Sequence, residues 1–243
     1  MNIAAHVGLT NHPVWLETFG DVLAVVATRY DRAIEDDEIT RIHQEDCAQA
    51  LGLPWGGDAK FERNDNRANY RAIAALLDRD RALFDVGESD RERLLSYTTL
   101  NVAVGNTDAH AKNHALLHRA DGAVRLAPIY DVAAPPFVFD GNLHLALRVS
   151  QVVYQPDVKL EDLVAEGTSW GLAVPDAERV ATETLERILA AVAECPATDR
   201  IAATIPGYVA TQATNLLQGK AAGAGSSASP IALMDRIAMP GRA

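Results

Sequence analysis

Apolar residues recur at helical spacing through most of the C-terminal part of this sequence. Three alanine-rich segments, 160–172, 175–195 and 201–219, carry apolar residues every three or four positions, which is typical of amphipathic helices. No internal repeat is visible. The pattern predicts a predominantly α-helical α+β protein that ends in a helical subdomain, with only short strands elsewhere.

Further helices are expected upstream of this region. Ser89 or Asp90 can cap a helix whose apolar stripe must end near Gly105, because serine and aspartate favour the first position and glycine the last. Residues 44–53 and 70–84 also have helical spacing, whereas residues 56–70 are loop-like.

Two stretches favour strands. The valine-rich run from Asp21 to Arg32 is continuously apolar and suits a buried strand. Between His114 and Asp131, two short apolar segments flank Asp121 and Gly122, and Asp-Gly in this position is a strong hairpin signal. Residues 142–150 could form a further strand.

Composition excludes several classes of function. With 243 residues and 48% hydrophobic residues, the chain can bury an ordinary core. A net charge of −11 would repel a phosphate backbone, so any anion site must be local. Cys47 and Cys195 lack the spacing of a disulfide framework, and no apolar run or leader suggests a membrane segment. A cytoplasmic protein is expected.

Three polar residues have the order that phosphoryl transfer needs. Asp108 and Asn113 lie five positions apart, and Asp131 follows the predicted hairpin. In protein kinases an aspartate positions and deprotonates the attacking hydroxyl, an asparagine five residues later binds Mg²⁺, and a second metal-binding aspartate follows a hairpin. The order therefore fits a kinase catalytic lobe, although Asp-x4-Asn alone is common by chance.

At these residues the sequence resembles the HipA family of bacterial serine/threonine kinase toxins. The matching text is VGNTDAHAKNHALL, RLAPIYDV, VVATRYDR and QEDCAQALGLPWGGDAKFE, in the order of the family. The resemblance implies a protein-kinase-like C-terminal lobe over residues 1–218, with a short hinge strand and a small hairpin at the cleft. Within it, residues 1–35 would be a hinge-proximal helix and strand, 36–150 the catalytic part and 151–218 a helical subdomain. After this lobe, the small and polar residues beyond Gly219 predict a flexible tail over 219–243.

The resemblance also implies roles for individual residues, with ATP and Mg²⁺ as cofactors. Asp108 would be the catalytic base, Asn113 and Asp131 would bind Mg²⁺, and His110 and Lys112 would line the catalytic loop. In the hinge, backbone groups around Thr28 and Tyr30 would meet adenine, and Asp31 would lie near the ribose.

Partners follow from the same resemblance. It implies the toxin of a type II toxin–antitoxin pair, a small HipB-like helix-turn-helix antitoxin, and a protein substrate such as an aminoacyl-tRNA synthetase. Nucleic acid would be contacted only through the antitoxin.

The upper half of the ATP site is not visible in this sequence. Family members carry a further N-terminal region with a phosphate-covering loop, an autophosphorylated serine and a lysine on a strand. Here no lysine precedes Lys60 and no serine precedes Ser89. We therefore expect a catalytic lobe without its lid, and the alternative function is a non-catalytic module that binds an antitoxin or a separate lobe.

Two simpler interpretations remain open. Asp108 follows Gly105, Asn106 and Thr107 and could be an ordinary loop or capping aspartate. His110, His114 and His118 recur every four residues, which would gather three imidazoles on one face of a helix and create a zinc site. The predicted hairpin competes with that helix.

Overall fold

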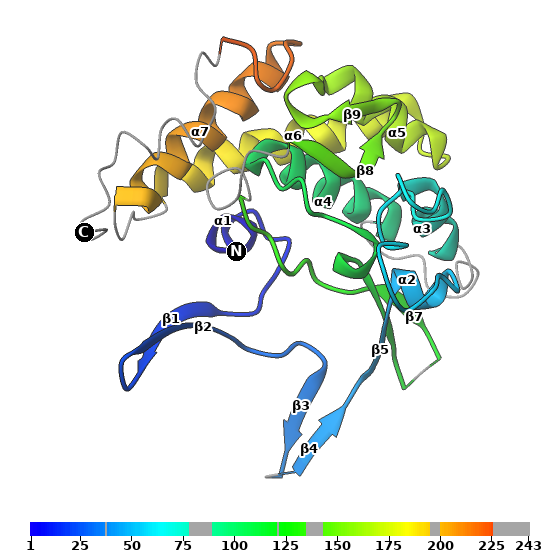
Figure 1. Cartoon of the computed structure of the whole chain (residues 1–243), viewed down its shortest axis with the longest axis vertical. Coiled ribbons are helices and arrows are strands. Elements are labelled where there is room, and N and C mark those ends of the chain that lie inside the picture. Colours follow the sequence, from blue (N-terminus) through cyan, green and yellow to red (C-terminus); the bar gives the residue numbers. More distant parts are fainter. Residues whose placement is uncertain (37, 78–88, 121, 135–142, 195–199, 226–243) are drawn as a thin grey trace.

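The computed structural model describes residues 1–36, 38–77, 89–120, 122–134, 143–194 and 200–225. In this part of the chain, helices form a compact body and four small antiparallel sheets lie around it or extend from it (Figure 1). The helices are α1 (Asn2–His6), α2 (Cys47–Ala50), α3 (Tyr70–Leu76), α4 (Asp90–Val104), α5 (Leu160–Ser169), α6 (Val174–Glu194) and α7 (Arg200–Leu217).

Helix α4 is the centre of the body. Every residue from Leu94 to Val104 is buried, and the helix packs against α5, α6, α7 and β7. Ser89 caps its first turn, and Gly105 ends it in the left-handed conformation at φ 71°, as the sequence predicted. The residues that follow α4 are therefore attached to the most deeply buried element of the fold.

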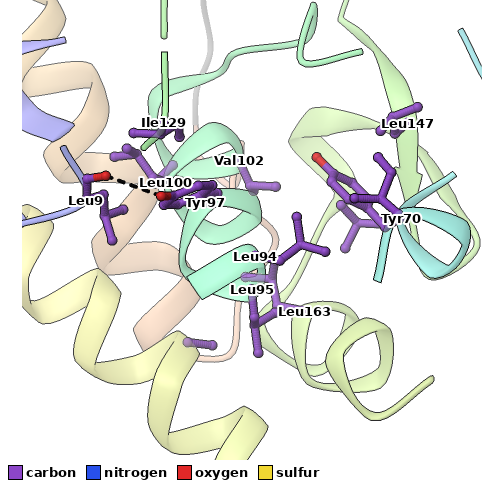
Figure 2. Close-up of a cluster of buried hydrophobic side chains, with 14 of the residues drawn as sticks. Leu9, Tyr70, Leu94, Leu95, Tyr97, Leu100, Val102, Ile129, Leu147 and Leu163 are labelled. Atoms are coloured by element: carbon purple, nitrogen blue, oxygen red, sulfur yellow. Dashed lines mark hydrogen bonds between the residues drawn. The ribbon is translucent and has the colours of Figure 1, made fainter. Parts of the chain in front are cut away.

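The core around α4 joins distant parts of the chain. Tyr97 is 2% exposed, and its hydroxyl lies 3.4 Å from the carbonyl oxygen of Leu9 (Figure 2). The same hydroxyl lies 3.1 Å from the carbonyl oxygen of Ala127. Leu9 precedes β1, and Ala127 leads to Asp131. The core thus holds the segment before β1 and the segment that leads to Asp131 against one helix.

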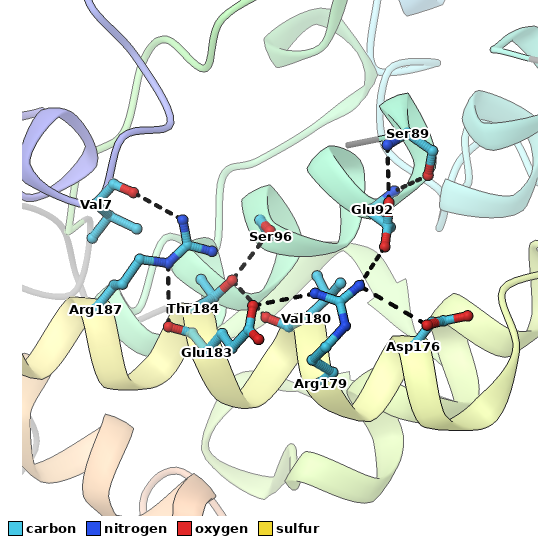
Figure 3. A network of polar contacts seen from close by, with 10 residues as sticks. All are labelled: Val7, Ser89, Glu92, Ser96, Asp176, Arg179, Val180, Glu183, Thr184 and Arg187. Carbon is cyan, nitrogen blue, oxygen red and sulfur yellow. Dashed lines mark hydrogen bonds and ion pairs between the residues drawn. The ribbon is translucent and has the colours of Figure 1, made fainter. Parts of the chain in front are cut away.

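Helix α6 is connected to α4 by polar contacts. Arg179 of α6 donates to Glu92 at 2.6 Å, and Thr184 donates to Ser96 at 3.1 Å in a buried position (Figure 3). Arg187 also donates to the carbonyl oxygen of Val7, beyond α1, at 3.4 Å. These contacts join α6 to α4 and to the segment that follows α1.

The predicted hairpin is present. It forms one sheet with an additional strand, β5 (His43–Asp46), in the order β5-β6-β7, where β6 is Ala115–His118 and β7 is Val124–Leu126. β8 (His144–Val149) confirms the strand expected at 142–150 and pairs with β9 (Val152–Tyr154). Short 3₁₀ turns occupy Ala111–Asn113 and Gln155–Asp157.

Two hairpins extend away from the helices (Figure 1). β1 (Val14–Phe19) pairs with β2 (Val22–Ala27), and β3 (Arg32–Glu35) pairs with β4 (Glu38–Arg41). The prediction of a buried strand at 21–32 is wrong in its burial, because Val25 is 71% exposed and Leu23 is 64% exposed. A continuous apolar run indicates a strand that needs covering on both faces, and the described residues do not supply that cover.

Other boundaries also differ from those expected. The predicted helix at 44–53 begins as strand β5, and only α2 is helical, with Asp46 accepting from the backbone N–H of Gln49 at 2.8 Å. The helix expected at 70–84 is described as far as Leu77, and its remainder lies outside the described residues.

The start of the predicted tail is packed against the body. The N–H of buried Ala222 donates to Val158 at 2.8 Å, and residues 226–243 lie outside the described part. In the described ranges no helix is both long enough and apolar enough to cross a membrane.

Candidate active site

The loop after α4 is anchored to the segment that carries Asp131. The side-chain amide of buried Asn106 donates to Asn101 in α4 at 2.9 Å and to the carbonyl oxygen of Asp131 at 3.4 Å. Thr107 accepts from the N–H of Ala146 at 2.8 Å. These bonds bring residues that are far apart in the sequence to one end of α4.

Asn113 and Asp131 are in direct contact. The Asn113 side-chain amide donates to an Asp131 carboxylate oxygen at 2.5 Å, and its carbonyl oxygen accepts from the His110 N–H at 3.1 Å. Asp131 has φ 56°, a left-handed backbone that is uncommon for residues other than glycine. Such local strain is frequent at functional sites. Asn113 is buried and Asp131 is exposed.

Asp108 presents its carboxylate to solvent. It is the exposed residue in a loop whose neighbours Thr107 and Ala109 are both buried. An exposed carboxylate on a loop with a fixed backbone is accessible to a second molecule, as a group that receives a proton from a substrate must be.

His110 makes a contact that the sequence reasoning missed. Lys60 donates to His110 Nε2 at 2.8 Å, which requires an unprotonated Nε2. Burial lowers the His110 pKa and the nearby Lys60 charge lowers it further, while Asp108 and Asp131 act in the opposite direction. The imidazole is thus a neutral group in contact with a cation, and both carboxylates are close enough to act on it.

Lys60 could have been found from the sequence by its position. It lies in the DAKFE text that carries the family resemblance, in a region otherwise without lysine. Sequence spacing alone does not connect it to His110, fifty positions later. The contact arises because the N–H of Ala111 donates to the Lys60 carbonyl oxygen at 3.1 Å, holding the two loops together.

Lys112 lies in the same loop but has different contacts. Its ammonium is 3.4 Å from the carbonyl oxygen of Trp55, and its own carbonyl oxygen accepts from the Tyr130 hydroxyl at 2.6 Å. In this structure the lysine bonded to His110 is therefore Lys60 and not Lys112.

The three regularly spaced histidines do not converge. His114 is buried and donates from Nδ1 to the His110 carbonyl oxygen at 3.2 Å, whereas His118 is bonded to Glu45 at 2.8 Å. Among the residues that the structure describes, no group of three or more histidine, cysteine, aspartate or glutamate side chains is arranged to hold a metal ion. The histidines are separated because His110 and His114 lie in the loop before the β6–β7 hairpin, whereas His118 lies on strand β6.

The predicted hinge connects β2 to β3. Thr28 donates its N–H to the Pro13 carbonyl oxygen at 3.0 Å. The Tyr30 ring lies 6.1 Å from the Tyr130 ring, so the hinge contacts the residue before Asp131. Asp31 is bonded to Arg29 at 2.6 Å and to Arg32 at 2.7 Å, and the hydrogen bond from Arg29 is the main cause of its lowered pKa.

Comparison with known proteins identifies the family. The family model described as the HipA-like C-terminal domain matches residues 1–194. The chain belongs to this family. It is 30% identical over 194 residues to "Putative kinase Y4mE" of Sinorhizobium fredii, and 25% identical over 228 residues to the serine/threonine-protein kinase toxin HipA of Shewanella oneidensis.

The matches cover most of this chain but about half of each relative. The alignments span 79% and 87% of this chain, and 44% and 51% of Y4mE and HipA. The solved complex of Shewanella oneidensis HipA with HipB and operator DNA contains a chain that matches with a TM-score of 0.72 at 24% identity, over 90% of this chain and 53% of that chain. The fold of this HipA-like domain is therefore the fold of the corresponding part of that protein.

Proposed function

We propose that this HipA-like domain is the catalytic lobe of a serine/threonine protein kinase that transfers the γ-phosphate of ATP to a protein hydroxyl. The observation that carries the proposal is the gathering of Asp108, Asn113 and Asp131 at the C-terminal end of α4, with Asn113 and Asp131 in direct contact. Relatives named as kinases support it at the level of the family.

The side chains present fit Mg²⁺. The ion prefers oxygen ligands and is usually held by one or two protein groups together with phosphates and water. Asp131 offers a carboxylate oxygen that is exposed to an incoming nucleotide. The amide oxygen of Asn113 accepts from the His110 N–H and its nitrogen faces Asp131, so the amide would turn to direct its oxygen at the ion. When bound, the ion would neutralise charge on the phosphates. Asp108 would orient the attacking hydroxyl and accept its proton.

Adenine would lie against the hinge. The backbone of Thr28 and Tyr30 would provide the polar groups that meet the base, and the contact between Tyr30 and Tyr130 connects this position to Asp131. Asp31, which accepts hydrogen bonds from Arg29 and Arg32, would lie near the ribose.

Partners extend the same proposal. The solved HipA relative is in complex with HipB and operator DNA, which supports a HipB-like helix-turn-helix antitoxin for this chain and a role as the toxin of a type II system. Nucleic acid would then be approached through the antitoxin, which agrees with the net charge of −11. An aminoacyl-tRNA synthetase as substrate and a cytoplasmic location belong to this proposal as well.

A second candidate function is supported by the β1–β2 hairpin. Leu16, Phe19 and Val22 are 53%, 58% and 65% exposed, and a two-stranded hairpin is at best marginally stable without a covering layer. Exposed apolar patches of this kind mark interaction sites. Because the chain spans about half the length of its curated relatives, the partner would be a lobe corresponding to their other half, and the domain alone would be a docking module.

The test is label transfer from γ-labelled ATP with Mg²⁺ to proteins of a bacterial lysate. Asp108→Asn should reduce transfer at least about 100-fold, because general base catalysis contributes this much. Asp157→Asn, which changes an exposed aspartate away from Asp108, Asn113 and Asp131, should have no effect. Equal transfer by both variants would refute the kinase proposal. Transfer only after a polypeptide matching the other half of the relatives is added would select the docking module.

A further inference from the structure

A cavity of about 1040 Å³ lies beside the first turn of α4, at the opposite end of this helix from the candidate active site. Its walls come from the segment before β1, from the hinge residue Tyr30, from β4 and β5, from the ends of β6 and β7, and from α4 itself. None of Asp108, Asn113 and Asp131 lines it. The catalytic loop follows the other end of the 15-residue α4, a helix about 22 Å long at 1.5 Å per residue.

The cavity is strongly basic in an acidic protein. Among the described residues that line it are four arginines, Arg41, Arg93, Arg119 and Arg125, and one carboxylate, Asp90. The chain as a whole carries 33 acidic and 22 basic residues. A local excess of arginine inside a concave surface concentrates positive potential there. The cavity therefore fits the kind of local anion site that the negative net charge of the chain still allows.

This carboxylate is already engaged. Asp90 accepts from the N–H of Leu126 at 3.1 Å and lies 3.8 Å from Arg93 and 3.9 Å from Arg125. Arg41 and Arg119 are exposed, and neither has an ion-pair partner in the described part of the chain. Two guanidinium groups thus remain available to a ligand.

The rest of the lining suits a ligand larger than a simple ion. Rings of His12 and Tyr30 lie 5.4 Å apart and those of His43 and His118 lie 4.8 Å apart, giving the cavity flat aromatic surfaces. Its volume is in the range of cavities that take nucleotide-sized molecules. Guanidinium groups recognise phosphate by paired hydrogen bonds.

We propose that this basic cavity binds a small molecule that carries two or more phosphate groups, at a site separate from the one that would hold ATP and Mg²⁺. Arg41 and Arg119 bind the phosphates, while Arg93 and Arg125 add positive charge from the wall. The ligand is either a nucleotide or an inorganic polyphosphate, since both present the same phosphate chemistry. The proposal does not depend on kinase activity.

The test is titration calorimetry of the whole chain with ADP and with tripolyphosphate. EDTA is added, so that Mg²⁺-dependent binding at Asn113 and Asp131 does not contribute. Saturable binding with one molecule per chain is expected. Tighter binding of ADP would assign the site to nucleotides, and tighter binding of tripolyphosphate would assign it to polyphosphates. Absence of saturable binding by both would overturn the proposal.

Single substitutions locate the binding. Arg41→Gln and Arg119→Gln should each weaken it about tenfold, as expected for the loss of hydrogen bonds to a charged group. Melting temperatures should stay unchanged, because neither side chain has an ion-pair partner among the described residues. Arg71→Gln removes the same charge from an exposed position outside the cavity and should leave binding unchanged. Binding that is equal in all three variants would place the ligand elsewhere and overturn the proposal.

Discussion

The helical body and the β1–β2 hairpin are both rich in apolar residues, yet they bury them to very different extents. Leu100 in α4 is 0% exposed, whereas Val25 in β2 is 71% exposed. The body has its own core, and the hairpin has apolar side chains without one. The difference indicates that the loop proposed as catalytic is positioned by the described chain itself, while the proposed adenine end adjoins a hairpin whose apolar side chains are uncovered by the described residues.

The largest expected effect lies in the body. Leu100→Ala should lower the free energy of unfolding by about 2–5 kcal/mol, because it removes a fully buried side chain and leaves a cavity. Urea denaturation of the variant and the wild type measures the loss. A loss below about 1 kcal/mol would show that α4 is not the rigid centre of the fold.

The next largest effect is expected in the pH dependence of the free energy of unfolding, through buried His114 in the helical body. Burial lowers the pKa of His114 to about 4 from 6.5. Between these values the unfolded chain binds a proton that the folded chain does not, so stability falls as the pH falls through this window, by about 3 kcal/mol in total from this residue.

Urea denaturation at pH 7.5 and pH 5 tests this effect. His114→Asn should be less stable than the wild type at pH 7.5, because the buried ring packs edge-on against Tyr70. It should also lose less stability on acidification. An identical pH dependence in the two proteins would contradict the buried neutral imidazole.

The smallest effect is expected in the hairpin. Val25→Thr keeps a β-branched residue in β2 and changes only an exposed side chain, so the free energy of unfolding should change by no more than about 0.5 kcal/mol. The same denaturation experiment measures it beside Leu100→Ala. A loss comparable to that of Leu100→Ala would mean that the hairpin is already covered, for instance by a second copy of the chain, and would remove the contrast between the two regions.

Local signals were sufficient for some elements. Ser89 and Gly105 fixed the ends of α4, and the Asp-Gly pair at 121–122 indicated the β6–β7 hairpin, because caps and turns depend on residues close in sequence. The trio of Asp108, Asn113 and Asp131 could be proposed from spacing and resemblance, and the roles assigned to these residues stay predictions.

Long-range features could not be read in this way. The exposure of Val25 depends on what covers the strand, and an apolar run has the same appearance whether its cover is present or absent. The bond between Lys60 and His110 depends on how two loops meet. The basic cavity joins Arg41, Arg93 and Arg119 from three elements, and no spacing in the sequence connects them.

The most direct test of the proposed active site is calorimetric measurement of ATP binding to the whole chain, with and without Mg²⁺. We expect Mg²⁺-dependent binding that Asp131→Ala weakens at least about tenfold. Asp157→Ala, at an exposed position away from Asp108, Asn113 and Asp131, should leave binding unchanged. Binding that is independent of Mg²⁺, or equal in the wild type and Asp131→Ala, would contradict the assignment of Asn113 and Asp131 as the groups that hold the nucleotide's metal ion.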